Sequence, residues 1–282
     1  MYWYFGDSLV NDLPKSSVEA YASDNQKLST FLQKLQGTKI VIMEPEFNKD
    51  AIIDDPNLSS RLTTAISSAI DTVKSQVEDT YFSLCMTDTG NRSATEAYDC
   101  EYEVCALGDR PEWDKTETIY TALADKLDFL SFQQMLAPFS RDPANPGTWN
   151  EPNPITYTTE ELGVDYFAQR MVNFTTYLNE KYNKPVFLPY IGIGTVTWDD
   201  INTNENVDDG EVDLYGWELT LVDIYRQLSE AQTELLNAGM FGYAPMTLFD
   251  NPQHDIVDGV KGYQYFLQNE YHLGIMKSGA VD

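Results

Sequence analysis

The sequence predicts an α/β protein built as a (β/α)8 barrel of the TIM type, and three observations support this fold class. Short apolar runs alternate with amphipathic segments along all 282 residues, which is the pattern of a parallel sheet wrapped by helices. Long connections follow the apolar runs, whereas the returns are short, as at Gln36–Thr38. No Gly-x-Gly-x-x-Gly or Walker-type loop follows a predicted strand, so a nucleotide-binding sheet has no support. Long connections on one rim are typical of a barrel that carries a site there.

Six segments are predicted as strands from their apolar, β-branched and aromatic residues. In chain order they are Tyr2–Gly6, Lys39–Glu46, Thr80–Met86, Leu127–Leu136, Lys184–Ile193 and Met240–Phe249. A closed barrel of this type needs eight strands. Either two strands are hidden in predicted loops, or the barrel is atypical or lacks its two amino-terminal β/α units. We favour the second explanation because Tyr2 already begins a strand, and we expect one domain over residues 1–282.

Helices are predicted between the strands from apolar residues at helical spacing. They are Ser17–Leu35, Leu58–Val77, Lys115–Leu127, Thr159–Tyr182 and Tyr215–Asn237, followed by a mostly helical tail over Gly262–Met276. Gly37 and Gly239 are expected to end the first and the fifth of these helices. The Thr158-Thr159-Glu160-Glu161 sequence offers a cap at the start of the fourth.

The charge of the chain narrows its range of partners. Forty-five acidic and 18 basic side chains give a formal net charge of −27, which repels phosphate backbones and anionic lipid surfaces. We therefore expect no nucleic-acid binding. No apolar run approaches the roughly 18 residues of a membrane-spanning helix, so no membrane insertion is expected. Met1 is followed directly by Tyr-Trp-Tyr-Phe-Gly, so we expect no signal peptide in this chain.

Three cysteines allow a limited interpretation. Cys100 and Cys105 lie five residues apart in an acidic segment, whereas Cys85 lies inside an apolar run. A disulfide between Cys100 and Cys105 would suit an exported protein, with Cys85 as a buried core thiol. The alternative is a zinc site, but His254 and His272 lack a ligand-like neighbour three or four residues away, so we expect no metal centre of this kind.

Two glutamates follow the second predicted strand at the point where its apolar run ends. In the sequence KIVIMEPEFN, Glu44 and Glu46 are two residues apart, so a strand that continues through them would place both on one face. The carboxyl-terminal strand ends of parallel α/β proteins are where their functional groups lie. The sequence therefore predicts a carboxylate pair at the functional rim. The alternative is a structural pair held by ion pairs or hydrogen bonds.

This segment resembles the glycoside hydrolase superfamily of barrels. Met43-Glu44-Pro45 is similar to the Asn-Glu-Pro at the end of strand four in the large clan of retaining glycosidases (clan A). The spacing of Glu44 and Glu46 also resembles the Asp-x-Glu pairs of chitinase-type and lysozyme-type barrels. Gly192-Ile193-Gly194 occupies the strand end where the clan has its nucleophilic glutamate. The resemblance implies a glycosidase barrel without the usual pair on strands four and seven.

Glycosidic cleavage needs a carboxylic acid that protonates the leaving oxygen and a carboxylate that activates water or attacks directly. We assign Glu44 as the general acid and Glu46 as its partner or positioning group. Other polar residues at or just past the ends of apolar runs are candidates for substrate contacts: Asp7, Asp88, Gln133, Gln134, Tyr190 and Asp250. Each of these has a purely structural role as its alternative. Gln133 and Gln134 could bind sugar hydroxyls or a reacting acetamido group.

Predicted loops rich in aromatic or acidic residues are further candidates for contacts with sugar or calcium. Trp113, Trp149 and Trp198 lie in predicted loops after strands, where a flat ring can stack on a sugar. The acidic segment Asp199–Asp213 could bind calcium through oxygen ligands, although it lacks the spacing of a known calcium loop, and a solvated charged loop is its default interpretation.

The resulting hypothesis is an exported glycoside hydrolase, secreted or periplasmic, that acts as a monomer on a polysaccharide or oligosaccharide without an organic cofactor. The alternative from another class is a catalytically inactive glycan-binding barrel or surface scaffold. A polysaccharide lyase or deacetylase is a third hypothesis. It is disfavoured because a lyase would need a Tyr/His or Arg site near the cleft and a deacetylase usually needs a His-rich metal site.

Overall fold

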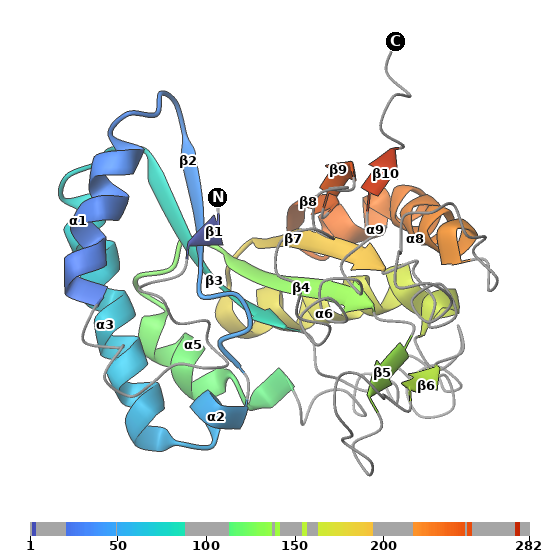
Figure 1. Cartoon of the computed structure of the whole chain (residues 1–282), viewed down its shortest axis with the longest axis horizontal. Coiled ribbons are helices and arrows are strands. Elements are labelled where there is room, and N and C mark those ends of the chain that lie inside the picture. The colour runs from blue at the N-terminus through green and yellow to red at the C-terminus, as the bar shows by residue number, and fades with distance from the viewer. Residues whose placement is uncertain are drawn as a thin grey trace, which may run out of the picture.

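The computed structural model describes residues 2–3, 21–48, 50–87, 113–136, 139–141, 154–156, 163–193, 217–245, 247–249 and 274–276. Within them, one sheet contains the strands β1 (Tyr2–Trp3), β2 (Lys39–Met43), β3 (Thr80–Thr87), β4 (Leu130–Leu136), β7 (Val186–Ile193) and β8 (Met240–Pro245) (Figure 1). Every neighbouring pair is parallel, and the spatial order is the chain order. In a doubly wound sheet the order of the strands reverses partway across the sheet, whereas here it follows the chain throughout, as it does in a barrel. The described strands form a partial (β/α) barrel, which confirms the predicted fold class.

Helices connect the strands and lie along the outside of the sheet (Figure 1). They are α1 (Tyr21–Leu32), α2 (Asp50–Ile53), α3 (Pro56–Lys74), α5 (Glu117–Leu123), α6 (Phe167–Tyr182), α8 (Trp217–Glu230) and α9 (Gln232–Asn237), with a 3-10 turn, η4 (Val164–Tyr166), before α6. The five predicted helices are confirmed in place, but the fifth is divided into α8 and α9. Gly37 and Gly239 both have positive φ, as expected after helix ends. Among the described helices, none has the length and apolar character that crossing a bilayer requires.

Helix α3 begins two residues earlier than predicted because Asp55 caps it. The Asp55 carboxylate accepts hydrogen bonds from the backbone N–H groups of Asn57, at 3.0 Å, and Leu58, at 3.1 Å. Pro56 occupies the first helical turn, where its missing N–H costs nothing. The predicted cap at residues 158–161 lies outside the described residues.

Two small sheets depart from the sequence prediction. Strands β5 (Phe139–Arg141) and β6 (Pro154–Thr156) pair in antiparallel fashion within a segment predicted as loop. Strands β9 (Thr247–Phe249) and β10 (Gly274–Met276) pair in parallel. The predicted helical tail is therefore wrong at residues 274–276, where a three-residue apolar run was too short to distinguish from a helix by periodicity.

The main sheet has two faces of different character. The face toward the helices contributes to the large apolar core, with Val41 and Met43 of β2 level with Phe82 and Leu84 of β3. The opposite face carries a small cluster of Ile42, Cys85 and Phe129. Ser83 and Ser131 of the neighbouring strands β3 and β4 join through their hydroxyl groups at 2.8 Å. Successive side chains of each strand therefore point alternately toward the helices and toward the interior of the barrel.

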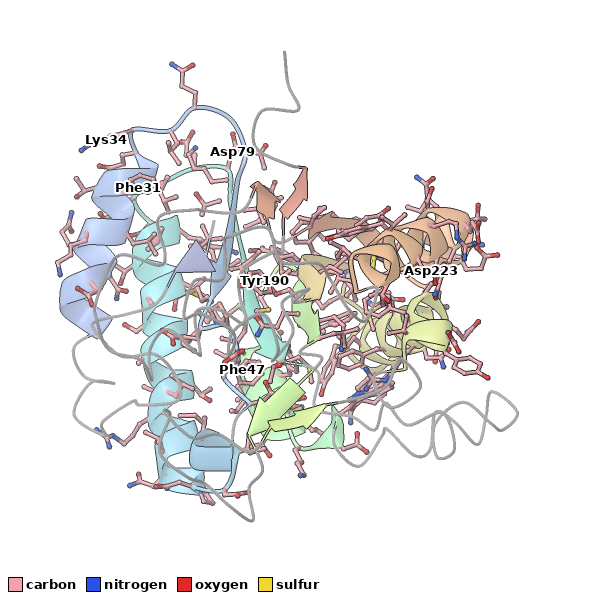
Figure 2. All side chains as sticks on the ribbon, turned by 45° about the vertical axis from the view of Figure 1, so that its right-hand side comes forward. Phe31, Lys34, Phe47, Asp79, Tyr190 and Asp223 are labelled. Carbon is pink, nitrogen blue, oxygen red and sulfur yellow. The ribbon has the colours of Figure 1, made fainter. Side chains whose placement is uncertain are left out.

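Asp128 links β3 and α3 at the amino-terminal rim of the barrel. Its carboxylate accepts a hydrogen bond from the Phe82 N–H at 2.8 Å and forms a 2.8 Å ion pair with Lys74 at the end of α3. Figure 2 shows Asp79, in the turn before β3, at this end of the molecule together with Phe31 and Lys34. The carboxyl-terminal rim, where the candidate site lies, is at the other end of the strands.

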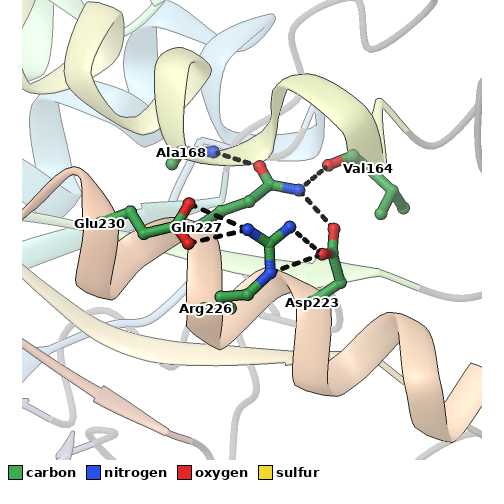
Figure 3. A network of polar contacts seen from close by, with 6 residues as sticks. All are labelled: Val164, Ala168, Asp223, Arg226, Gln227 and Glu230. Carbon is green, nitrogen blue, oxygen red and sulfur yellow. Dashed lines mark hydrogen bonds and ion pairs between the residues drawn. The ribbon is translucent and has the colours of Figure 1, made fainter.

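Gln227 fastens α8 to the start of α6 (Figure 3). Its side-chain amide accepts from the Ala168 N–H at 3.3 Å and donates to the Val164 carbonyl at 2.8 Å. It also donates to the Asp223 carboxylate at 2.8 Å, and Arg226 binds Asp223 from the same helix. The hydrogen bonds from Gln227 and Arg226 lower the pKa of the Asp223 carboxyl.

Tyr120 of α5 anchors that helix beneath the candidate site. Its hydroxyl lies 3.2 Å from the carbonyl oxygens of both Leu84 and Ser131, so it binds β3 and β4 together. Its ring meets that of Phe47 edge-on with centroids 5.3 Å apart. Burial raises the pKa of the Tyr120 hydroxyl well above its usual value, so the group stays a donor.

Replacing Tyr120 by Phe is expected to lower the free energy of unfolding by about 1 kcal/mol, because the hydroxyl donor is lost from a buried site. Urea denaturation followed by circular dichroism measures this change. Tyr81→Phe is the control, since Tyr81 is 45% exposed. Equal stability of the Tyr120→Phe variant and the parent protein would contradict the anchoring role.

Candidate functional site at the carboxyl-terminal rim

A strained turn carries the two glutamates. Strand β2 ends at Met43, and Glu44 and Glu46 both have left-handed backbone, with φ of 43° and 67°. The expectation that the strand continues through Glu46 and places both carboxylates on one face is wrong, because the chain leaves the strand before either residue. Left-handed conformations of residues other than glycine cost of order 1–3 kcal/mol each, so surrounding contacts must hold this turn.

The two glutamates differ in their environment. Glu44 is completely buried, whereas Glu46 is partly exposed. The Glu46 carboxylate accepts a hydrogen bond from the side-chain amide of Gln133 on β4, with Nε2 and Oε1 2.6 Å apart. Hydrogen bonds to a charged acceptor are shorter and stronger than neutral ones. Glu46 is therefore a positioned carboxylate with a side that reaches solvent.

Backbone and side-chain contacts join the turn to β3. The Glu46 N–H donates to the Cys85 carbonyl at 2.9 Å. Asn48 donates from Nδ2 to the Thr87 carbonyl and accepts the Thr87 N–H at Oδ1, both at 2.7 Å. Phe47 lies between Glu46 and Asn48 in the sequence, and its side chain is completely buried in the core (Figure 2). The segment after β2 thus continues to pair with β3 beyond the end of the regular strand.

Strand register brings two of the predicted residues to the same level. Thr87 of β3, Gln133 of β4 and Tyr190 of β7 are direct neighbours across the sheet. Paired residues of adjacent strands share a face, so Tyr190 and Gln133 are on the same side. Tyr190 is partly exposed. The structure therefore groups Glu46, Gln133 and Tyr190 at one rim, from three different strands or strand ends.

Gln134 occupies a different place from its neighbour Gln133. It is 1% exposed, and its carbonyl oxygen lies 3.5 Å from a guanidinium nitrogen of Arg170 on α6. Arg170 is also buried, and its guanidinium lies over the Trp113 ring at 5.9 Å. Burial lowers the pKa of Arg170 to about 9, which leaves it charged at neutral pH. This placement gives Gln134 a structural contact and argues against the expected contact with sugar.

The prediction that Trp113 lies in a loop is wrong, and of the three tryptophans expected to offer a ring for stacking on sugar, Trp113 does not have an accessible ring. Its side chain is 1% exposed, and its ring stacks on that of Phe174 with centroids 4.2 Å apart. Tyr177 of the same helix packs against it at 5.3 Å. Trp113 comes just before α5, and α6 covers it completely. Burial of this kind depends on a helix that is distant in sequence, so the local pattern did not indicate it.

Several predicted residues lie outside the described part of the chain. These are Asp7, Asp88, Trp149, Trp198 and Asp250 among the substrate contacts, Cys100 and Cys105 of the proposed disulfide, and the acidic segment Asp199–Asp213. Cys85 is confirmed as a buried core thiol, and its burial raises its pKa. Among the described residues, no group of three or more His, Cys, Asp or Glu side chains could hold a metal ion.

The arrangement has the components of acid–base chemistry. One carboxyl group is buried, a second is partly exposed and held by an amide donor, and both come from one short turn at the end of a barrel strand. Different environments are how two carboxyl groups acquire the separate roles of acid and base.

Comparison with solved structures identifies the fold. A hyperthermophilic β-glucosidase mutant matches 89% of this chain at 14% sequence identity with a TM-score of 0.52. Fpglu1 from Fervidobacterium pennivoraus matches 84% of it at 10% identity with a TM-score of 0.51. The matched regions span 59% and 53% of those two chains. No protein-family model and no curated protein matches the sequence. The chain thus shares the barrel fold of solved β-glucosidases over somewhat more than half their length.

Gln134→Leu is expected to lower the free energy of unfolding by about 1–3 kcal/mol, because it removes an acceptor from the buried Arg170 guanidinium. Gln134→Glu is the matched variant, since it keeps an acceptor oxygen near the guanidinium and should lose less. Urea denaturation curves of the three proteins measure the differences. A Gln134→Leu variant as stable as the parent would show that the long contact with Arg170 contributes nothing.

Proposed function

We propose that the protein is a glycoside hydrolase that cleaves an oligosaccharide or polysaccharide with Glu44 and Glu46 as the reacting carboxyl groups. The observation that carries this proposal is the pair of carboxyl groups in one strained turn at the carboxyl-terminal rim of the barrel, with Glu46 held by Gln133. Active sites of such barrels lie at this rim. The fold shared with β-glucosidases supports the choice of chemistry.

The environments of the two glutamates suggest their roles. Burial disfavours a charged carboxylate, so the completely buried Glu44 suits the part of proton donor to the leaving oxygen. The N–H donor of Gln133 matches a carboxylate oxygen, so Glu46 suits the part of base or nucleophile. Tyr190 is level with Gln133 and partly exposed, which makes it a candidate for contact with a sugar hydroxyl.

Glu44→Gln and Glu46→Gln are each expected to lower kcat by roughly 10²–10⁴-fold, the usual contribution of a general acid or base. A panel of aryl glycosides, oligosaccharides and polysaccharides provides the assay. Glu78→Gln is the matched control, because Glu78 is an exposed glutamate in the turn before β3 at the opposite rim. Full activity of both rim variants would contradict the assignment. Binding of glycans without hydrolysis by the parent protein would instead indicate a non-catalytic glycan-binding barrel.

The same variants separate the two roles. An aryl glycoside with a good leaving group needs little protonation of its leaving oxygen, so Glu44→Gln should retain more activity on that substrate than on an unactivated one. Glu46→Gln should be impaired on both. The reverse pattern would exchange the roles of the two residues.

Gln133→Leu is expected to lower kcat about tenfold or more with little change in KM, because Gln133 orients Glu46 and does not contact sugar in the ground state. Steady-state kinetics on the best substrate of the panel measure both constants. A raised KM with unchanged kcat would show that Gln133 binds substrate directly, as the sequence suggests.

A further inference from the structure

The turn after β2 requires an external restraint. Glu44 and Glu46 both occupy left-handed backbone, and Pro45 between them fixes its own φ. A turn with two such residues relaxes unless neighbouring contacts over-determine it. The position of the Glu46 carboxylate therefore depends on what holds the turn from beyond its own residues.

Asn48 provides a large part of this restraint through its side chain. It is 3% exposed, and its side-chain amide makes two 2.7 Å hydrogen bonds to the two backbone groups of Thr87. One end of the amide donates and the other accepts, as a neighbouring strand would. Serine and threonine offer a single hydroxyl, and ionised aspartate only accepts. An asparagine is therefore chemically matched to this contact.

The contact closes a ring of interactions around Glu46. Thr87 pairs with Gln133 across β3 and β4, and Gln133 donates to the Glu46 carboxylate. Glu46 is in turn two residues from Asn48. A shift of Asn48 relative to Thr87 would thus move Glu46 relative to the Gln133 amide that holds it.

We propose that Asn48 is a positioning residue that fixes the Glu46 carboxylate against Gln133 for the hydrolytic reaction. This inference rests on the proposed glycosidase function. Asn48 does not touch substrate in this account, and it acts only through the turn.

Kinetics of Asn48→Ala provide the first test. We expect kcat to fall about 10–100-fold, since a displacement of about 1 Å at a reacting group can cost 10²-fold, and KM to change less than about threefold. Ser59→Ala is the control, because it removes another buried hydrogen bond, from Ser59 to the Ile52 carbonyl, on α3. The control should retain kcat. Equal losses of kcat in both variants would show a general effect of destabilisation and overturn the proposal.

Asn48→Asp provides a second test with a pH signature. The introduced carboxylate accepts the Thr87 N–H but faces the Thr87 carbonyl oxygen, whereas its protonated form can donate to that oxygen and restore both bonds. The ratio of kcat in this variant to kcat in the parent should therefore rise as pH falls. Glu44 and Glu46 of the turn and Cys85 of β3 are present in both proteins, so the ratio removes the part of their titration that the new carboxylate leaves unchanged. A pH-independent ratio would contradict the proposed contact.

Hydrogen exchange tests the proposal without any activity. The Glu46 N–H donates to the Cys85 carbonyl, so loosening of the turn in Asn48→Ala should speed its exchange at least tenfold, while the N–H of Ser75 at the end of α3 exchanges as before. Unchanged protection of Glu46 would overturn the positioning role. An inactive parent protein with this loss of protection would contradict the glycosidase function alone, and an active parent with unaffected variants would contradict Asn48 alone.

Discussion

The candidate site depends on one constraint, which is that pairing between β2 and β3 continues after β2 has ended. The regular ladder stops at Met43 and Leu84. The Glu46 amide and the Asn48 side chain then take over the hydrogen bonds of Cys85 and Thr87. The intervening turn can be strained because both of its ends are fixed. This attachment places the Glu46 carboxylate within hydrogen-bond reach of Gln133 on β4.

The two faces of the sheet carry different kinds of contact at the carboxyl-terminal rim. On the helix side, Phe47 packs against Tyr120, and Gln134 contacts Arg170 of α6. On the interior side, Glu46 meets Gln133, with Tyr190 at the same level. Adjacent residues such as Gln133 and Gln134 therefore serve different purposes, because successive side chains of a strand point to opposite faces. Substitutions on the two sides should accordingly affect different properties of the protein.

The sequence was sufficient for the order of the strands and for placing Glu44 and Glu46 at the carboxyl-terminal end of β2, and insufficient for the local geometry of that turn. Apolar periodicity predicted the six strands of the main sheet, since the core selects those residues directly. It did not predict that β2 ends before Glu44, because left-handed backbone at a glutamate is imposed by distant hydrogen bonds. Asn48 was missed for the same reason, as its partner Thr87 is 39 residues away. Trp113 was misassigned because α6, which buries it, is also remote in sequence.

A crystal structure of the Glu44→Gln variant with an oligosaccharide substrate bound would show whether the two glutamates flank the bond that is cleaved. We expect a glycosidic bond between residues 44 and 46, with their side-chain termini about 5–9.5 Å apart across it, the separation that glycosidases use. We also expect Gln133 to hold Glu46 in the complex. A sugar bound elsewhere, with both side chains remote from any anomeric carbon, would rule out Glu44 and Glu46 as the reacting groups.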